Sequence, residues 1–194
     1  MTTPEPSGTF FQTLSRVART VNSSLDIMPI LESIVATTAE TLGAKACSLR
    51  LLGPDGRTLM FGVAHGLSAG YRAKGPVLAD QSGVDDLALE RGETVVIADA
   101  TADDRFQYPE AAREEGIVSV LVTPLTAQGQ VIGALRVYMP ERHEFTADER
   151  GLAEAIASLS ALAIENGRLY ERLDRNYRAA VEFPQTGAPP REDD

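Results

Sequence analysis

Two pairs of short apolar segments in the middle of the chain, each pair joined by a glycine turn, constrain the fold most. Such segments, separated by only a few turn-forming residues, are typical of antiparallel β-hairpins. The first pair is 45–52 and 58–64, around Gly53-Pro54-Asp55-Gly56, and the second is 117–126 and 131–139, around Gln128-Gly129. A further apolar segment at 94–97 predicts one more short strand.

Apolar residues three and four positions apart predict helices at both ends of the chain. The first helix carries Phe10, Leu14, Val17 and Val21 on one face, and a second covers 27–42 with Asp26 as its N-cap and Gly43 at its end. A weaker helix is expected over 84–91, capped by Ser82 and ended by Gly92. A polar segment, 99–115, is expected to be a loop with one or two helical turns.

The last helix has the clearest start signal. Thr146-Ala147-Asp148-Glu149 matches a capping box, in which the threonine hydroxyl and the glutamate carboxylate each bind a free backbone N–H. No proline follows until after residue 178. Strands in the middle and helices at the ends predict an α+β fold with an antiparallel sheet of five to six strands.

The chain is expected to form one domain over residues 9–178. Residues 1–8 and 179–194 are polar and rich in proline, and the second segment ends in acidic residues, so both are expected to be disordered tails. No internal repeat or low-complexity linker divides the segment between them.

Composition excludes several classes of protein. The 194 residues include 18 Lys and Arg against 28 Asp and Glu, a net charge of −10, which argues against nucleic-acid and anionic-membrane partners. One cysteine, Cys47, and two histidines, His65 and His143, argue against disulfides and metal sites. No apolar run is long enough to span a bilayer, and the N-terminus does not look like a signal peptide. A cytoplasmic location is therefore expected.

A series of short motifs over about residues 14–170 resembles a GAF domain of bacterial type. None is specific alone, but together they occur in the family's order: TLGA at 41–44, CSL at 47–49, GETVVIAD at 92–99, DDRF at 103–106, EGIVS at 115–119, PL at 124–125, VIGAL at 131–135, FTADE at 145–149 and AIEN at 163–166. The resemblance implies a regulatory module that binds a small molecule. It places the terminal helices on one sheet face, often in a dimer, and the ligand on the other face, under loops 66–92 and 99–116.

Known chemistries of such domains do not fit these residues well. Cys47 lies within a predicted strand and is expected to be a small buried hydrophobe, which argues against covalent attachment of a bilin. A single cysteine cannot complete the disulfide cycle of a methionine sulfoxide reductase. His65 is the only candidate haem ligand, and a partly exposed loop histidine is the favoured interpretation. The Asn-Lys-x-x-Phe pattern of cyclic-nucleotide binders is missing at 138–143. We therefore predict no catalysis, metal or cofactor, and a small-molecule ligand whose identity the sequence does not give.

Strand periodicity predicts which residues line the ligand side. One face of each central strand is uniformly apolar, and the other is mixed. Arg50 and Arg136, if they share the mixed face, would clamp a carboxylate or phosphate, with Phe106 and Tyr108 closing over it. The alternative is that both arginines face solvent or pair with Asp99, Asp103 or Asp104. The expected ligand-binding residues are Ser48, Arg50, Phe106, Tyr108, Ser119, Thr123, Arg136 and Tyr138.

The apolar stripe of the last helix is longer than is needed to cover one sheet. Its heptad spacing, with Asn166 in the seam, favours a homodimer contact beside the first helix. The expected interface residues are Phe10, Leu14, Val17, Leu162, Asn166, Leu169, Tyr170 and Leu173. The sequence thus predicts a homodimeric, non-catalytic sensor that acts on a downstream signalling protein in trans or belongs to a longer protein. A degenerate domain that only dimerises is the alternative, and a small redox enzyme or a haem or tetrapyrrole sensor is less favoured.

Overall fold

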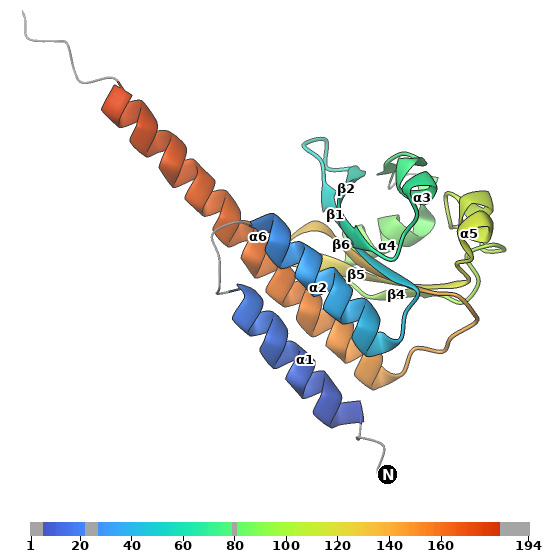
Figure 1. Ribbon diagram of the computed structural model, residues 1–194. Helices are drawn as coiled ribbons and strands as arrows, with labels where there is room; N and C mark the ends of the chain where they lie inside the picture. Colours follow the sequence, from blue (N-terminus) through green and yellow to red (C-terminus); the bar gives the residue numbers. More distant parts are fainter. Residues whose placement is uncertain (1–5, 22–26, 79–80, 183–194) are drawn as a thin grey trace, which may run out of the picture.

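The computed structural model describes residues 6–21, 27–78 and 81–182. A sheet lies between two helical layers, with α1, α2 and α6 on one side and α3, α4 and α5 on the other (Figure 1). The elements in chain order are α1 (Pro6–Val21), α2 (Ile27–Leu42), β1 (Ala46–Leu52), β2 (Thr58–His65), α3 (Ala69–Ala73), β3 (Val77–Leu78), α4 (Gly83–Arg91), β4 (Val95–Ile97), α5 (Pro109–Glu115), β5 (Ser119–Ala127), β6 (Gln130–Met139) and α6 (Ala147–Glu182).

The sheet has six strands in the order β3-β2-β1-β6-β5-β4, and every neighbouring pair is antiparallel. Both predicted hairpins are present, as β1–β2 and β5–β6. Gln128 and Gly129 join the second hairpin with φ values of 51° and 78°, the left-handed geometry that a tight two-residue turn between twisted strands requires. The α+β architecture expected from the order of the elements is confirmed.

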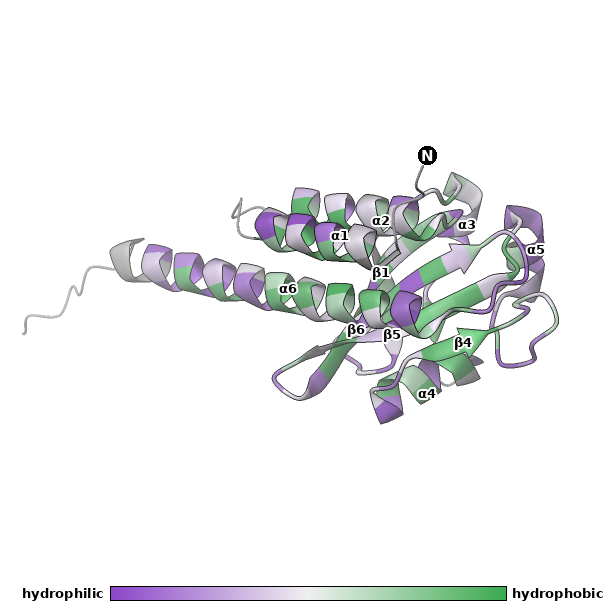
Figure 2. Cartoon of the chain, turned by 90° about the horizontal axis from the view of Figure 1, so that it is seen from below, coloured by the Kyte–Doolittle hydropathy of each residue, from purple (hydrophilic) through white to green (hydrophobic). Residues whose placement is uncertain are grey.

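The larger core lies between the sheet and the terminal helices. Figure 2 shows hydrophobic stretches along the strands that these helices cover. Leu31, Ile34 and Val35 of α2 and Ile156 of α6 pack there against Leu135 and other buried strand residues. Cys47 belongs to the same core and is fully buried, as expected, and burial raises the pKa of its thiol.

The predicted capping box starts α6. The Thr146 N–H donates to Glu149 Oε2 at 2.7 Å, and the Glu149 N–H donates to Thr146 Oγ1 at 3.2 Å. After about Ile164, α6 leaves the core and continues for another 18 residues, or about 27 Å, beyond the sheet (Figure 1). Over the described residues, no helix combines the length and apolar character needed to cross a membrane.

Some predicted boundaries are wrong. Because α1 begins at Pro6 and α6 reaches Glu182, residues 6–8 and 179–182 are helical rather than disordered tail. The rest of both predicted tails, and Asp26, lie outside the described residues. The loop that the resemblance places at 66–92 contains α3 and β3 in addition to the expected helix α4.

A glycine in each neighbouring strand, Gly133 in β6 and Gly62 in β2, lies close to the backbone of β1. A Cβ on Gly133 of β6 would lie 2.2 Å from the Arg50 carbonyl oxygen of β1, so no larger residue fits there. On the other side, Leu49 pairs with Val63 and Arg50 with Phe61, so Gly62 forms a bulge. This bulge keeps Val63 on the helix side while Arg50 and Phe61 face the opposite layer.

Candidate functional site

Strand register places the two predicted arginines on the same face of the sheet. In the β1–β6 pair, Ser48 lies opposite Arg136, and Arg50 lies opposite Ala134. Because directly opposed and alternate residues point to one side, Ser48, Arg50, Arg136 and Tyr138 all face the layer of α3, α4 and α5. The expectation that Arg50 and Arg136 share a face is therefore confirmed.

Arg136 is neutralised by an aspartate that sequence reasoning missed. Its Nη2 donates to Oδ2 of Asp85, in the first turn of α4, and both side chains are almost completely buried, at 1% and 0% exposure. The Ser82 hydroxyl donates to the same carboxylate oxygen rather than capping α4. Burial alone would lower the pKa of Arg136, but the Asp85 charge and the nearby tyrosines raise it overall. Arg136 is thus held as a cation with a partner.

The predicted partners of the arginines are engaged elsewhere. Asp103 forms an ion pair with Arg105, and Asp99 lies 3.8 Å from Arg142. Both aspartates also accept backbone hydrogen bonds within their own loop, which fixes them there. The arginine–aspartate alternative was thus correct in kind but wrong in residue, because the actual partner is contributed by a helix 51 positions away in the chain.

Arg50 is a buried cation without a matching carboxylate among the described residues. It has no exposed surface, and its guanidinium carbon lies 3.7 Å from the ring centre of Phe61. Nη1 reaches the Leu59 carbonyl oxygen at 3.4 Å, while Nε and Nη2 have no hydrogen-bond acceptor in the described part of the chain. Burial lowers the pKa of Arg50, and the nearby Tyr138 partly offsets this effect. Each buried, unpaired donor costs about 1–3 kcal/mol, so these N–H groups favour an added acceptor.

Lys74 brings a third cationic side chain to this cluster. It follows α3, and its Nζ lies 4.2 Å from the ring centres of both Tyr71 and Tyr108 and 5.6 Å from that of Phe106. Within the described residues, Nζ is buried and has no hydrogen-bond partner. Burial, together with the charges of Arg136 and Arg50, lowers the pKa of Lys74 to about 6. Only the position of Lys74 in a segment rich in glycine hinted at this role.

The predicted aromatic residues cover the cluster. The Tyr108 hydroxyl donates to the Pro76 carbonyl at 2.8 Å, and the Leu78 N–H donates to Gln107 Oε1 at 3.0 Å, so the segment before α5 is fastened to the segment after α3. Beneath it, Tyr138 and Ser48 share a hydrogen bond of 3.0 Å between their hydroxyls. Ser48 and Tyr138 thus share the sheet face of the two arginines, and Phe106 and Tyr108 lie beside Lys74.

Ser119 and Thr123 do not belong to this cluster. Ser119 lies opposite Met139, and Thr123 lies opposite Leu135. Because Met139 and Leu135 belong to the helix-side core, both polar side chains share that side. Ser119 Oγ donates to the Ala98 carbonyl and accepts from the His143 N–H, which fastens two loops. The prediction was wrong because polarity alone does not fix which face of a strand is turned to the pocket.

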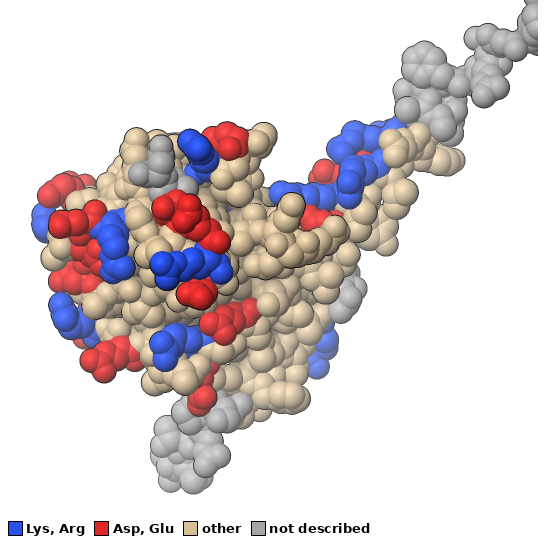
Figure 3. All heavy atoms as spheres, turned by 180° about the vertical axis from the view of Figure 1, so that it is seen from behind, with Lys and Arg blue, Asp and Glu red and all other residues tan. Residues whose placement is uncertain are grey.

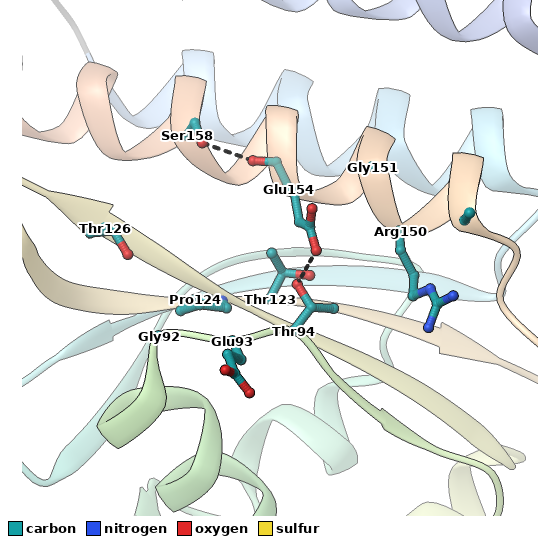
Figure 4. Close-up of a pocket in the computed structure, with 11 residues that line it drawn as sticks. Gly92, Glu93, Thr94, Thr123, Pro124, Thr126, Arg150, Gly151, Glu154 and Ser158 are labelled. Carbon is teal, nitrogen blue, oxygen red and sulfur yellow. Dashed lines mark hydrogen bonds between the residues drawn. The ribbon is translucent and has the colours of Figure 1, made fainter.

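Thr123 instead borders an open surface hollow of about 680 Å³ between α6 and β5 (Figure 4). Thr94 and Glu154 close part of it with a hydrogen bond of 2.8 Å. Glu93 and Arg150 also line it, but the charged groups do not converge on one point (Figure 4). A smaller pocket of about 220 Å³, lined by Tyr71, Lys74 and residues of α5, opens at the Lys74 side of the cluster. The cluster with its adjoining pocket is therefore the better candidate site.

The predicted dimer residues fall into two groups. In α1, Val17 is only 2% exposed and packs in the protomer's own core, with Phe10 and Leu14 against it, so Val17 is not available to a partner. In α6, the predicted residues are exposed in the protomer: Leu162, Asn166, Leu169, Tyr170 and Leu173.

Charge on one face of the molecule is mixed rather than segregated. On the face shown in Figure 3, acidic and basic side chains are interspersed over the globular part of the molecule. No group of three or more His, Cys, Asp or Glu side chains in the described part of the chain is arranged to hold a metal ion.

Comparison with known proteins identifies the family. A family model for the GAF domain matches residues 26–164, well over half of the chain, and the chain therefore belongs to the GAF domain family. This confirms the resemblance found in the sequence. A search of the curated proteins finds no match to the chain.

Solved structures share the fold at low sequence identity. The GAF domain of a phosphoenolpyruvate-protein phosphotransferase from Coxiella burnetii is 24% identical, with a TM-score of 0.74 over 84% of this chain and 96% of that chain. Free methionine-R-sulfoxide reductase from Neisseria meningitidis, in complex with its substrate, is 18% identical, with a TM-score of 0.73 over 88% and 96%. A phycoerythrobilin-bound GAF domain of a cyanobacterial phytochrome is 18% identical, with a TM-score of 0.68 over 84% and 97%.

Proposed function

We propose that this chain is a regulatory sensor domain that binds a small anion between the sheet and α3–α5 and has no catalytic activity of its own. The observation that carries the proposal is Arg50, a fully buried guanidinium in which two nitrogen atoms, Nε and Nη2, lack acceptors among the described residues. A guanidinium presents forked donors that match a carboxylate or a phosphate. Arg136, already paired with Asp85, would orient the ligand rather than neutralise it.

The comparisons agree with a binding role without defining the ligand. The phytochrome GAF domain is described as bound to phycoerythrobilin, and the reductase as bound to its substrate, so this fold accommodates very different molecules. For this chain, the buried position of the single cysteine argues against a redox cycle or a covalent bilin. Function must be argued from the site, and this site is cationic.

Anion-dependent stabilisation tests the proposal. A ligand that binds the folded state raises the melting temperature according to its concentration and dissociation constant. We expect sodium sulfate to raise the melting temperature above that in sodium chloride of equal ionic strength. Arg50→Gln should reduce this difference to the general stabilisation that sulfate gives folded proteins, whereas Arg142→Gln, at an arginine that is largely exposed, should retain it in full. An equal response of the wild type and Arg50→Gln, or no response from the wild type, would refute anion binding at Arg50.

We further propose that two copies of the chain pair through the projecting part of α6. Leu159, Leu162, Asn166, Leu169 and Leu173 follow the three- and four-residue spacing of a coiled-coil seam. Leu173 is 64% exposed in the protomer, an unfavourable position for leucine unless it is covered. Sedimentation of the full chain should indicate a dimer, and Leu169→Glu with Leu173→Glu should give a monomer. A double variant that remains dimeric would place the interface elsewhere.

A further inference from the structure

The candidate site contains more positive than negative charge. The two buried guanidinium groups of Arg50 and Arg136 have only one buried carboxylate, that of Asp85, to offset them among the described residues, and Lys74 is a third basic side chain beside them. Asp85 is bound to Arg136 and therefore does not neutralise Arg50. Glu114 and Glu115 line the adjoining pocket together with Lys74, and Glu115 already accepts hydrogen bonds from the N–H and hydroxyl of Ser68.

The Lys74 amino group lies where a positive charge is disfavoured. Its amino group lies between two tyrosine rings instead of reaching solvent, and it makes no hydrogen bond within the described residues. Desolvation and the charges of two buried arginines both disfavour its protonation, while Asp85 favours it weakly. The amino group is therefore largely uncharged at neutral pH, since the pKa of Lys74 is lowered to about 6.

We propose that the ligand is a doubly charged small anion that contacts Arg50 and Lys74 together, and that one proton is bound with it. This inference rests on the proposed function, because it assumes that the site binds an anion. The step adds a proton to the neutral Lys74 amine and forms a contact between the resulting ammonium and the anion. Two positive charges, on Arg50 and Lys74, then balance two negative charges on the ligand.

A single negative charge would not balance the protonated site. With Lys74 charged, a monoanion leaves one cation without a compensating charge, which is unfavourable for a buried group. A monoanion can therefore bind at Arg50 alone, with Lys74 neutral and without proton uptake. Ligand charge and proton uptake are thus coupled by the same lysine.

Sulfate and methanesulfonate separate these cases, because they share a tetrahedral sulfur group but carry two charges and one charge. Neither changes its charge between pH 6.5 and 8.5. Where Lys74 must gain a proton on binding, we expect the sulfate affinity of the wild type to weaken about tenfold for each pH unit in this range. The affinity for methanesulfonate should be weaker and independent of pH. Affinities are measured by thermal stabilisation at matched ionic strength.

Two substitutions at Lys74 make the test specific. Lys74→Met should bind sulfate more weakly and with no pH dependence, because no amine is left to protonate. Lys74→Arg keeps its charge throughout this range, so it should retain sulfate binding but lose the pH dependence. Lys45→Met, at the other lysine of the chain, should behave like the wild type.

The outcomes separate this inference from the proposed function. Sulfate binding that requires Arg50 but has the same pH dependence in the wild type and Lys74→Met would overturn proton coupling and leave anion binding intact. Absence of sulfate binding to the wild type would overturn both. Equal pH dependence for sulfate and methanesulfonate would overturn the preference for a dianion.

Discussion

Replacing Lys74 by methionine should stabilise the empty domain increasingly as the pH falls. In the unfolded chain, the pKa of a lysine is about 10.4, so its amine is protonated throughout the neutral range. In the folded domain, the pKa of Lys74 is lowered to about 6, so the folded state binds one proton fewer between these values. Stability therefore rises with pH over this interval, and it is lost as the pH falls toward 6.

The size of the effect follows from the proton count. One full proton changes the free energy of unfolding by about 1.4 kcal/mol per pH unit. The rings of Tyr71 and Tyr108 favour the charged amine by about 0.5–2 kcal/mol. This raises the lower limit of the pH range in which the folded and unfolded states differ by one proton. Between pH 9 and pH 7, the wild type should lose about 2 kcal/mol relative to Lys74→Met, which has no amine to titrate.

Urea unfolding followed by circular dichroism measures this difference. Both proteins are compared at one protein concentration from pH 6 to pH 9, since pairing of copies would shift the apparent stability. Lys45→Met serves as the control, because it removes the only other lysine of the chain and should leave the pH profile of the wild type unchanged. Parallel profiles for the wild type and Lys74→Met would refute the claim that the buried amine is neutral.

Three further changes test the structure in the same urea assay. Asp85→Asn leaves the Arg136 charge buried without its partner and should cost about 3–5 kcal/mol, and a loss below 1 kcal/mol would contradict the burial of the pair. Gly133→Ala should cost about 3 kcal/mol or more, because its Cβ would meet the Arg50 carbonyl at 2.2 Å, whereas Gly151→Ala, with open space around it, should be neutral or stabilising. Thr146→Ala should cost about 1 kcal/mol by removing one half of the capping box, and an unchanged midpoint would argue against that cap.

The strands and long helices could be predicted because local sequence determines them. The hairpins depend on turn residues and on alternating apolar positions next to them. Helix α6 depends on its capping box and on the continuous segment without proline that follows. Arg50 and Arg136 could be placed on one face for the same reason, since alternation along each strand assigns its two sides.

The rest of the site depends on contacts between distant segments. Asp85 reaches Arg136 only because α4 is folded over the sheet, and nothing near either residue indicates the pair. Ser119 was assigned to the wrong side because the register between β5 and β6, rather than its polarity, decides its direction. Lys74 was not considered because Tyr108, one of the two rings beside its amino group, is 34 positions away in the chain.

The continuous course of α6 has a mechanical consequence. One end of this helix is fixed to the sheet by the core and the capping box, and the other is free of the globular part. Because the 18 residues beyond the core span about 27 Å, a bend of about 10° where the helix leaves the core displaces its far end by about 5 Å. A small change in the direction of α6 at the edge of the core thus moves its far end by about the width of a side chain.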